Sequence, residues 1–597
     1  MPKVIVFGVD GLSMPLMQRY ANAGDLPHIS RMLAQGSSTE LLPYISAWGD
    51  VNWVAFMAGQ ALGNAWIGQG MPADNARTGN LLGRMAEKNL RAALVHFPES
   101  VQASAPHASY AAYWGRSEHW PAELIAPMGH TSRLASRADG GQPKQKLGWP
   151  PASALAYHNK GSWRALEPDG EGYRVTLAAR DGRVLNGRLH VEAGAAVLSL
   201  GGQTLNLEPG RWSAWLDLAA LDVPGSVRFN LVRFDADNND VELLQSQVTD
   251  RGRITDSPEL ADAMASLPGP FFSKWTVKAA LEETYRETAY QEAEEQSLWL
   301  AQSALDLTQR RGFSLWATVH RLVDESHHNC LGQCDPESPF YDAERAEAYD
   351  QVMRECYQVL DRSISKLMAE MDDDTVLVLA SDHGAVPNAY MCDIYRYLEK
   401  YELVELDEHG QPDMQRSLVY LKAERGGLEI FVNLTGREPT GIVSSNGFAE
   451  VCAKTLLALG NWSVIDNGKT RNAVSVALLK DDAVALGFWG DCAGDIVFAY
   501  NSGFVWGVSP GLEDICPVDA PGANHGPQKP TAVTAMASNY GGLVMYGAGI
   551  RRGYFRDRKA VGPSRMIDPA ATIAHLLGLP LDTLDGRVLH DMLAGER

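Results

Sequence analysis

The chain has 597 residues, of which 45% are apolar and 21% charged, and its formal net charge is -21. One hydrophobic core stops growing at ~250–300 residues, so we expect a main domain with insertions. The acidic balance argues against nucleic acid and anionic membranes as partners and leaves a small-molecule substrate. Seven cysteines, no signal peptide and no apolar run of ~18 residues predict a cytoplasmic protein without a disulfide framework.

In chain order, the first predicted element is a buried strand over residues 4–9, an apolar run that ends in Asp10. The segment "LPHISRMLAQG" then predicts a helix with Gly36 as its C-cap. Further buried strands are predicted at 314–324, 375–384 and 541–549, with a long helix at 342–371 and a closing helix in "DPAATIAHLLGLP". Strands alternating with helices predict an α/β fold with a mostly parallel central sheet flanked by helices.

Residues 170–248 follow a different pattern, in which apolar and polar residues alternate between turns rich in Gly, Asn and Asp. This alternation predicts antiparallel strands. We therefore predict an α/β core over residues 1–105 and 268–597. Residues 106–267 are then an inserted β-rich cap over the carboxyl edge of the sheet.

Acidic and histidine residues gather at the carboxyl ends of the predicted strands, where parallel sheets place their sites. Asp324 and His328 stand four residues apart, which brings them to one face if the segment is a helical turn. The full set of candidate ligands is Asp10, Asp324, His328, Asp382, His383 and His525. Three carboxylates and three imidazoles suit two divalent ions, with Zn²⁺ as the first choice and Mn²⁺ as the second.

The order of these motifs resembles the alkaline phosphatase superfamily, in particular its type I phosphodiesterase/nucleotide pyrophosphatase branch. The matching segments include "VFGVDGLSMPLM", "WVAFMAG", "VDESHHN", "VLVLASDHGAVPN" and "ANHGPQKP". The resemblance implies a metal-dependent hydrolase of this fold. It assigns Asp324, His328 and His525 to one ion, and Asp10, Asp382 and His383 to the other. In the family, a Thr or Ser hydroxyl between the ions attacks phosphorus.

That hydroxyl is missing here, because "SAWGDVNWVAFMAG", aligned on Trp53, places Gly49 at the nucleophile position and Asp50 beside it. Four interpretations follow. A shift of three residues would make Ser46 the nucleophile, or the protein binds metals without catalysis. Otherwise Asp50 attacks phosphorus itself, or it bridges the ions while a metal-bound hydroxide attacks. We favour the bridging carboxylate, although a turn carboxylate or helix N-cap is the ordinary role of such an Asp.

A fourth carboxylate near the ions would weaken their attraction for a phosphate dianion, so simple phosphomonoesters are the poorest candidate substrates. We expect hydrolysis of a phosphodiester or phosphonate-type substrate, and the same site would also suit a C–N or C–O bond. Trp48, Asn52 and Lys529 are the predicted substrate-binding residues, with Lys529 facing an anionic group. The sequence leaves a homo-oligomeric assembly open.

Overall fold

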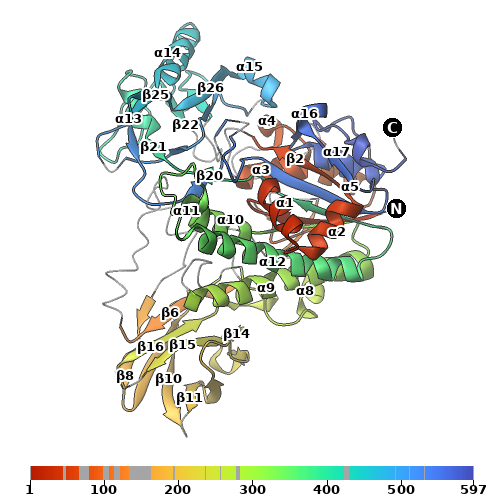
Figure 1. Cartoon of the computed structure of the whole chain (residues 1–597), viewed down its shortest axis with the longest axis vertical. Coiled ribbons are helices and arrows are strands. Elements are labelled where there is room, and N and C mark those ends of the chain that lie inside the picture. Colours follow the sequence, from red (N-terminus) through yellow and green to blue (C-terminus); the bar gives the residue numbers. More distant parts are fainter. Residues whose placement is uncertain are drawn as a thin grey trace.

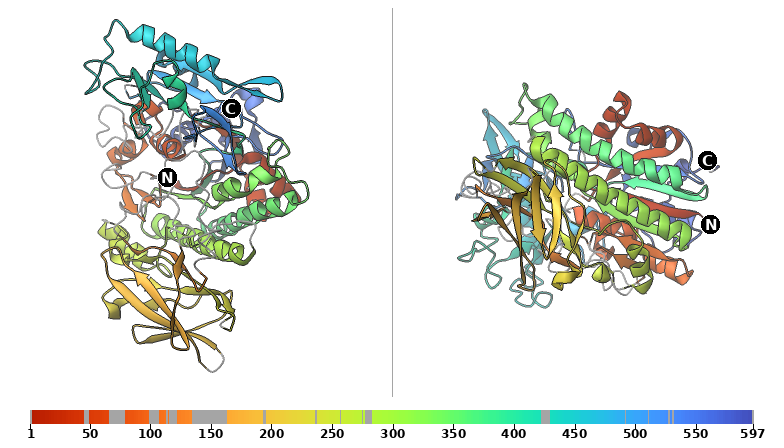
Figure 2. Two further views of the ribbon diagram at one scale, coloured as in Figure 1. Left: turned by 90° about the vertical axis from the view of Figure 1, so that its left-hand side faces the viewer. Right: turned by 90° about the horizontal axis from the view of Figure 1, so that it is seen from below.

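The computed structural model describes residues 2–44, 49–65, 79–98, 107–112, 114, 122–133, 163–192, 195–235, 237–255, 257–273, 275–276, 283–421, 429–490, 492–509, 511–526, 528–529 and 532–595. The molecule is elongated, with the α/β part in the middle and a separate group of β-strands at each end (Figures 1 and 2). Both termini lie on the α/β part (Figure 1).

A nine-stranded sheet forms the centre of the described structure, in the order β32-β2-β31-β19-β1-β18-β3-β4, with β33 beside β2. Every pair in it is parallel except those of β31, which runs antiparallel to both β19 and β2. The predicted α/β class with a mostly parallel sheet is therefore confirmed. The strands are β1 Lys3–Val9, β2 Ser37–Leu42, β3 Ala92–Val95, β4 Ser109–Ala111, β18 Leu315–His320, β19 Thr375–Ala380, β31 Gly541–Gly547, β32 Tyr554–Arg556 and β33 Ser564–Arg565.

The middle strands β1, β18 and β19 read as apolar runs because helices cover both faces of the sheet. Helices α9 and α12 lie side by side as one layer and α2 packs on α12, while α17 packs on α3 and α5 (Figure 2). Their bounds are α1 Met14–Ala23, α2 Pro27–Gln35, α3 Gly49–Ala58, α5 Leu81–Glu87, α9 Glu283–Leu305, α12 Ala346–Glu370 and α17 Asp568–Leu576. Among the helices described, none has the length and apolarity that a membrane crossing requires.

Gly36 follows helix α2 as predicted, but its role differs from the expected left-handed C-cap. Its φ is -124° and its ψ is -163°, so the backbone is extended. A Cβ at this position would lie 2.2 Å from the Met545 carbonyl oxygen in β31. The glycine therefore allows the close approach of two backbones, which a reading of the local sequence does not reveal.

The strands of residues 170–248 pair with one another in the antiparallel direction, as the alternating pattern predicts, whereas β6 and β7, which precede them, are parallel. A five-stranded sheet has the order β12-β11-β10-β9-β8, and a four-stranded sheet has the order β15-β16-β6-β7 (Figure 1). Strand β4, however, pairs with β3 in the central sheet, so the described part of the insertion begins after Ala111 rather than at residue 106. The main strands are β6 Met128–Thr131, β7 Trp163–Ala165, β8 Glu167–Asp169, β9 Gly172–Ala178, β10 Val184–Glu192, β11 Ala195–Leu200, β12 Gln203–Leu207, β15 Phe229–Asp235 and β16 Asp240–Gln245.

A third part, between Tyr390 and Pro517, has a hydrophobic core of its own, although the sequence predicted it as part of the α/β core. Its main sheet has the order β22-β23-β27-β26, and helices α13 and α14 pack on it. The elements are β21 Tyr390–Cys392, α13 Ile394–Glu399, β22 Val419–Leu421, β23 Ile430–Val432, α14 Phe448–Asn461, β24 Ser463–Asp466, β25 Lys469–Asn472, β26 Val474–Leu479, β27 Ile496–Tyr500, β28 Phe504–Trp506 and β29 Ile515–Pro517.

Helix α9 carries one carboxyl group, Glu292, that makes stability depend on pH. Glu292 is 1% exposed and accepts hydrogen bonds from the Thr276 backbone N–H and hydroxyl at 2.7 and 2.9 Å. Burial raises the pKa of Glu292 from 4.5 to about 7, although the nearby Arg228 charge opposes the rise. Between these pH values the folded chain holds a proton that the unfolded chain has lost, so the free energy of unfolding falls as pH rises.

We expect the variant Glu292→Gln to remove that decline, which for a single buried group amounts to about 3 kcal/mol between pH 4.5 and 7. Thermal melts of both proteins across this pH range measure the effect. Glu287→Gln changes an exposed carboxylate on the same helix and should leave the decline in place. A decline that persists in Glu292→Gln would contradict the assignment.

Candidate dinuclear metal site

The six predicted ligands meet at the carboxyl ends of three neighbouring strands. Asp10 follows β1, the pair Asp382 and His383 follows β19, and Asp324 lies in helix α10, Leu322–Ser326, just after β18. His328 belongs to a π-helical turn, His327–Leu331, that continues α10, and His525 follows the short strand β30, Ala523–Asn524. All six side chains are nearly buried: Asp382 is 0% exposed and the His328 side chain 11%.

One group of possible ligands consists of Asp10, Asp382 and His383, as predicted. His383 Nε2 lies 3.2 Å from Asp10 Oδ1 and 3.0 Å from Asp382 Oδ2. Their ligand atoms all lie within 4.8 Å of one another, which is close enough for a single ion to contact all three. Two carboxylates and one imidazole around an open position suit a catalytic zinc site.

The second group consists of Asp324, His383 and His525, so it includes His383 where His328 was predicted. His328 is nevertheless adjacent, because its Nε2 lies 3.2 Å from Asp324 Oδ2. The rings of His383 and His525 stack with centroids 3.5 Å apart and an interplanar angle of 3°. The two groups are therefore adjacent and have His383 in common. The spacing of four residues places Asp324 and His328 on one helical face, as predicted.

The surroundings of these residues fit metal binding. The outer ring nitrogens of His328 and His383 lie 2.6 and 2.9 Å from the carbonyl oxygens of Ala523 and Gly384. Hydrogen bonds of this kind turn Nε2 towards the site, as in metal-bound histidines. The buried atoms Asp324 Oδ1, Asp382 Oδ2 and His383 Nε2 make no well-aligned hydrogen bond within the described structure, and their close polar neighbours are other atoms of the same site, such as Asp382 Oδ2 at 3.0 Å from His383 Nε2. Divalent ions would satisfy these atoms.

The charge balance of the site favours cations as well. Burial raises the pKa of Asp10 well above its usual range, and the charges of Asp382 and Asp324 raise it further. Burial alone would lower the pKa of His383, but the carboxylates of Asp382 and Asp10 raise it well above its ordinary value. Three acidic groups in one buried space repel each other, and bound divalent ions relieve that repulsion.

Gly49, the first residue of helix α3, faces this site directly. A Cβ built on Gly49 would lie 2.4 Å from Asp382 Oδ2 and 2.9 Å from His383 Nε2. Any side chain at this position would therefore point between the ligands. The prediction that Gly49 stands at the nucleophile position agrees with this orientation and stays a prediction.

Asp50, predicted to bridge the ions, is absent from both groups of ligand atoms found among the described residues. Its Oδ1 accepts a hydrogen bond from Trp114 Nε1 at 3.1 Å, and Trp114 is 1% exposed. The indole in turn lies beneath the Arg321 guanidinium, 4.6 Å from its ring centroid. The bridging role of Asp50 stays a prediction, and the contact with Trp114, 64 residues away, is not visible in the sequence.

The predicted substrate-binding residues have different positions. Asn52 is 0% exposed and its Oδ1 accepts the Tyr44 backbone N–H at 2.8 Å, so it braces the chain before α3, and its contact with substrate stays a prediction. The sequence alone did not indicate this burial within α3. Lys529 lies beside a cavity close to His525. Trp48, and the alternative nucleophile Ser46, lie outside the described residues.

Two other sets of residues that could bind metal lie outside the two ligand groups found among the described residues. His327 and His320 are buried, and burial lowers the pKa of each imidazole to about 4. Cys330 and Cys334 are free, and burial raises the pKa of the Cys330 thiol to about 12. These groups remain uncharged at neutral pH, and none of them belongs to the ligand groups found in the described part of the chain.

Comparison with known proteins supports the resemblance. The family model "Type I phosphodiesterase / nucleotide pyrophosphatase" matches residues 246–455, a segment that contains Asp324, His328, Asp382 and His383. A search of curated protein sequences finds no match.

Three solved structures are similar over nearly their whole length. A variant of alkaline phosphatase PafA is 12% identical with a TM-score of 0.46, and 99% of each chain is covered. An inactive variant of murine ectonucleotide pyrophosphatase/phosphodiesterase 5, in complex with AMP, is 11% identical with a TM-score of 0.43 and full coverage of both chains. Phosphonoacetate hydrolase from Sinorhizobium meliloti, in complex with phosphonoacetate, is 10% identical with a TM-score of 0.42, covering 97% of this chain and 95% of that one.

Proposed function

We propose, from the premise that this chain is a hydrolase of the type I phosphodiesterase/nucleotide pyrophosphatase family, that it cleaves a phosphodiester or phosphonate ester by direct attack of water. The observation that carries the proposal is Gly49, whose missing side chain would point at Asp382 and His383. In this proposal a water molecule takes the role of the missing hydroxyl, next to Asp382 and His383, the two residues that a side chain at position 49 would meet.

The ligand residues would hold two divalent ions, Zn²⁺ as the first choice and Mn²⁺ as the second. Asp10, Asp382 and His383 surround one position, and Asp324, with His328 and His525, surrounds the other. Such ions lower the pKa of water and offset the charge on phosphoryl oxygens. The close grouping of carboxylate oxygens and imidazole nitrogens, all within 4.8 Å of one another in each group, supports their presence.

The protein residues then position the water and remove its proton. Water enters beside Gly49, its oxygen bonds to phosphorus, and the bond from phosphorus to the departing alkoxide breaks. We assign the proton released by the water to the Asp50 carboxylate, which follows Gly49 in the chain and is held by the Trp114 indole at 3.1 Å. The amino end of α3, which begins at Gly49, adds a partial positive charge where the phosphoryl group would lie.

The variant Asp50→Asn tests the proton acceptor. We expect turnover to fall by ~10²–10⁴-fold, as is usual when a general base is lost, while both ions stay bound. Steady-state kinetics and metal analysis measure the two effects separately. Loss of one ion would instead make Asp50 a metal ligand, and unchanged turnover would remove it from the reaction. Ser46→Ala is the matched control, because a comparable loss there would identify Ser46 as the nucleophile.

The function itself is tested with metal-reconstituted protein and three 4-nitrophenyl substrates: a phosphodiester, a phosphonate monoester and a phosphomonoester. We expect the first two to be preferred. A chiral phosphorothioate diester should give inversion at phosphorus, because water attacks once. Retention would reveal a covalent intermediate and overturn direct attack. A metal-loaded protein that cleaves none of the three would overturn the phosphoester assignment and turn the search to amide and carboxylic ester substrates.

A further inference from the structure

A cavity of about 690 Å³ lies between the α/β core and the third part of the chain. Its walls come from the loop after helix α11, Gly332–Cys334, from strands β20, Val386–Pro387, and β21, and from the β24–β25 hairpin. Strands β20, β21 and β25 are labelled in Figure 1. Cavities of this size hold small organic ligands. The mechanism above does not use it.

The strand pair β20–β30 connects the cavity wall with the candidate metal site. Pro387 in the cavity wall pairs with Ala523, whose carbonyl oxygen lies 2.6 Å from the ring nitrogen of His328. Lys529, also in the wall, follows His525 by four residues, a length of chain that spans at most about 14 Å. The Cα atoms of His525 and Lys529 are therefore at most about 14 Å apart, a separation that an arm of a substrate can cover.

Lys529 provides a cation in this wall. Its backbone N–H donates to the Tyr500 carbonyl at 2.7 Å, and its carbonyl accepts from Asn539 Nδ2 at 2.8 Å, so the backbone is fixed on both sides. Across the part of the chain that the structure describes, its ammonium group has no ion pair or hydrogen bond. A half-buried cation without a partner favours an anionic ligand.

Another part of the wall consists of two stacked aromatic rings and an ion pair without net charge. The Arg471 guanidinium lies over Tyr390 and Phe504, 5.4 and 5.3 Å from the ring centroids. The two rings stack with centroids 5.2 Å apart, and Arg471 Nη1 lies 2.9 Å from Asp466 Oδ2. Because Asp466 neutralises Arg471, the remaining charges on the wall are Lys529 and the exposed Glu337.

We propose that this cavity binds a carboxylate or phosphate group carried on the non-reacting arm of the substrate, with Lys529 as its counter-ion. The inference rests on the proposed function and narrows it. The substrate is then a phosphodiester or phosphonate ester with a second anionic group, joined by an arm long enough to cover the distance between His525 and Lys529. The amide side chains of Asn467 and Asn501 in the wall supply further hydrogen-bonding groups.

The test uses the metal-loaded full chain and 4-nitrophenyl phosphonate esters that carry alkyl arms of increasing length, ending either in a methyl or in a carboxylate. Beyond a threshold length, the carboxylate should lower KM. Lys529→Met should raise KM for those carboxylates about tenfold, the value of one charge-assisted hydrogen bond, with kcat unchanged. Lys529→Arg should restore the low KM. The methyl-ended esters should show no difference between the variants.

Equal KM values for both kinds of arm at every length would overturn the proposal. So would an unchanged KM for the carboxylate esters in Lys529→Met, because Lys529 would then not be the counter-ion. Glu337→Gln removes a negative charge from the wall and should lower that KM or leave it unchanged. Absence of turnover would question the proposed function rather than the cavity, so benzoate binding to the same protein is measured by saturation-transfer NMR. A benzoate signal that Lys529→Met abolishes supports the cavity even then, and a signal that it leaves unchanged overturns it.

Discussion

Asp382→Asn is expected to remove at least one bound ion per chain and to reduce turnover by at least ~10²-fold, since loss of an outer partner of a ligand already costs 10–100-fold. Asp382 is 0% exposed, and its Oδ2 lies 3.0 Å from His383 Nε2. The asparagine keeps the size of the side chain and the Oδ1 atom that accepts the Gly11 backbone N–H at 3.3 Å. The change therefore removes charge and a ligand without opening a cavity.

Metal analysis and steady-state kinetics measure this result. Asp361→Asn is the matched control, because Asp361 is also a buried carboxylate that accepts backbone N–H groups, but it lies on α12 and contacts His28 and Ile29. Its variant should keep both ions and full turnover per folded molecule. Asp382→Asn with two ions and normal turnover would contradict the site.

Chelation gives an independent measure of the same site. Ions bound at a thousand times their Kd stabilise a fold by about 4 kcal/mol, so their removal should lower the melting temperature of the wild type. The acidic cluster of Asp10, Asp324 and Asp382 is then left without counter-ions. Asp382→Asn should respond much less to the chelator, because it has lost both the ion and one of the repelling charges.

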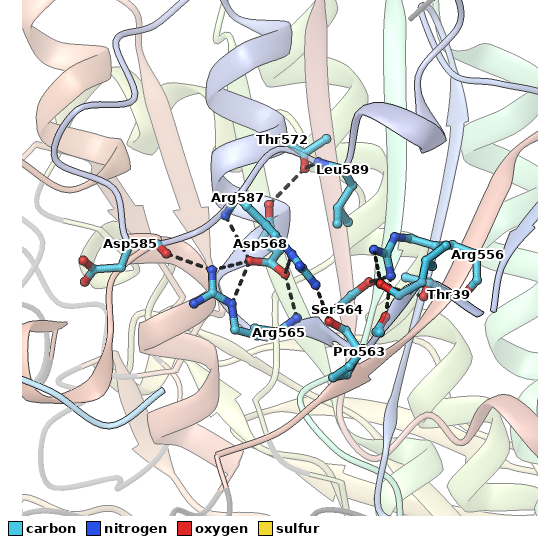
Figure 3. A network of polar contacts seen from close by, with 12 residues as sticks. Thr39, Arg556, Pro563, Ser564, Arg565, Asp568, Thr572, Asp585, Arg587 and Leu589 are labelled. Carbon is cyan, nitrogen blue, oxygen red and sulfur yellow. Dashed lines mark hydrogen bonds and ion pairs between the residues drawn. The ribbon is translucent and has the colours of Figure 1, made fainter. Parts of the chain in front are cut away.

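Asp568→Asn has the largest expected effect on stability. This carboxylate, at the start of α17, is 0% exposed and receives five hydrogen bonds from the backbone and guanidinium groups of Arg565 and Arg587 (Figure 3). Arg565 also donates to the Asp585 carbonyl at 2.9 Å, so the network ties strand β33 and the segment around residue 587 to the helix. Removing one partner of a buried pair costs about 3–5 kcal/mol, and we expect about 3 kcal/mol here because the side chains of Arg565 and Arg587 are 32% and 50% exposed.

Thermal and urea unfolding, followed by tryptophan fluorescence, measure that cost. Asp591→Asn is the comparison, since Asp591 also pairs with an arginine, Arg556, but is 34% exposed. Exposed pairs contribute about 0–1 kcal/mol, so this variant should unfold close to the wild type. Equal destabilisation by the two substitutions would show that burial of the Asp568 network is unimportant.

The central sheet and the grouping of acidic side chains at its edge could be predicted because both leave local signals. Apolar runs ending in acidic residues mark buried strands whose carboxyl ends meet at one edge, and this brings Asp10, Asp324 and Asp382 together. Other contacts join segments that are far apart in the chain. Examples are the hydrogen bond between Asp50 and Trp114 and the pairing of Pro387 with Ala523. Such contacts depend on how the parts pack, and no periodicity encodes them.

The antiparallel direction of β31 and the separate core of the third part were missed for a related reason. An apolar run such as that of β31 indicates burial on both faces but says nothing about direction. The strands β22, β23 and β27 are three to five residues long and are separated by long connections. Short buried runs of this kind cannot be distinguished from pieces of the larger core until the elements are seen in space.

The distribution of the ligands along the chain has a consequence for biosynthesis. Asp10 leaves the ribosome long before His525, and the sheet needs β31, residues 541–547, to fill the space between β2 and β19. At ~5–20 residues per second, roughly half a minute to nearly two minutes separates the first ligand from the last. Asp324 and Asp382 emerge in turn within that interval, and His525 follows last. The proposed loading of metal ions would therefore be one of the last steps in making the protein.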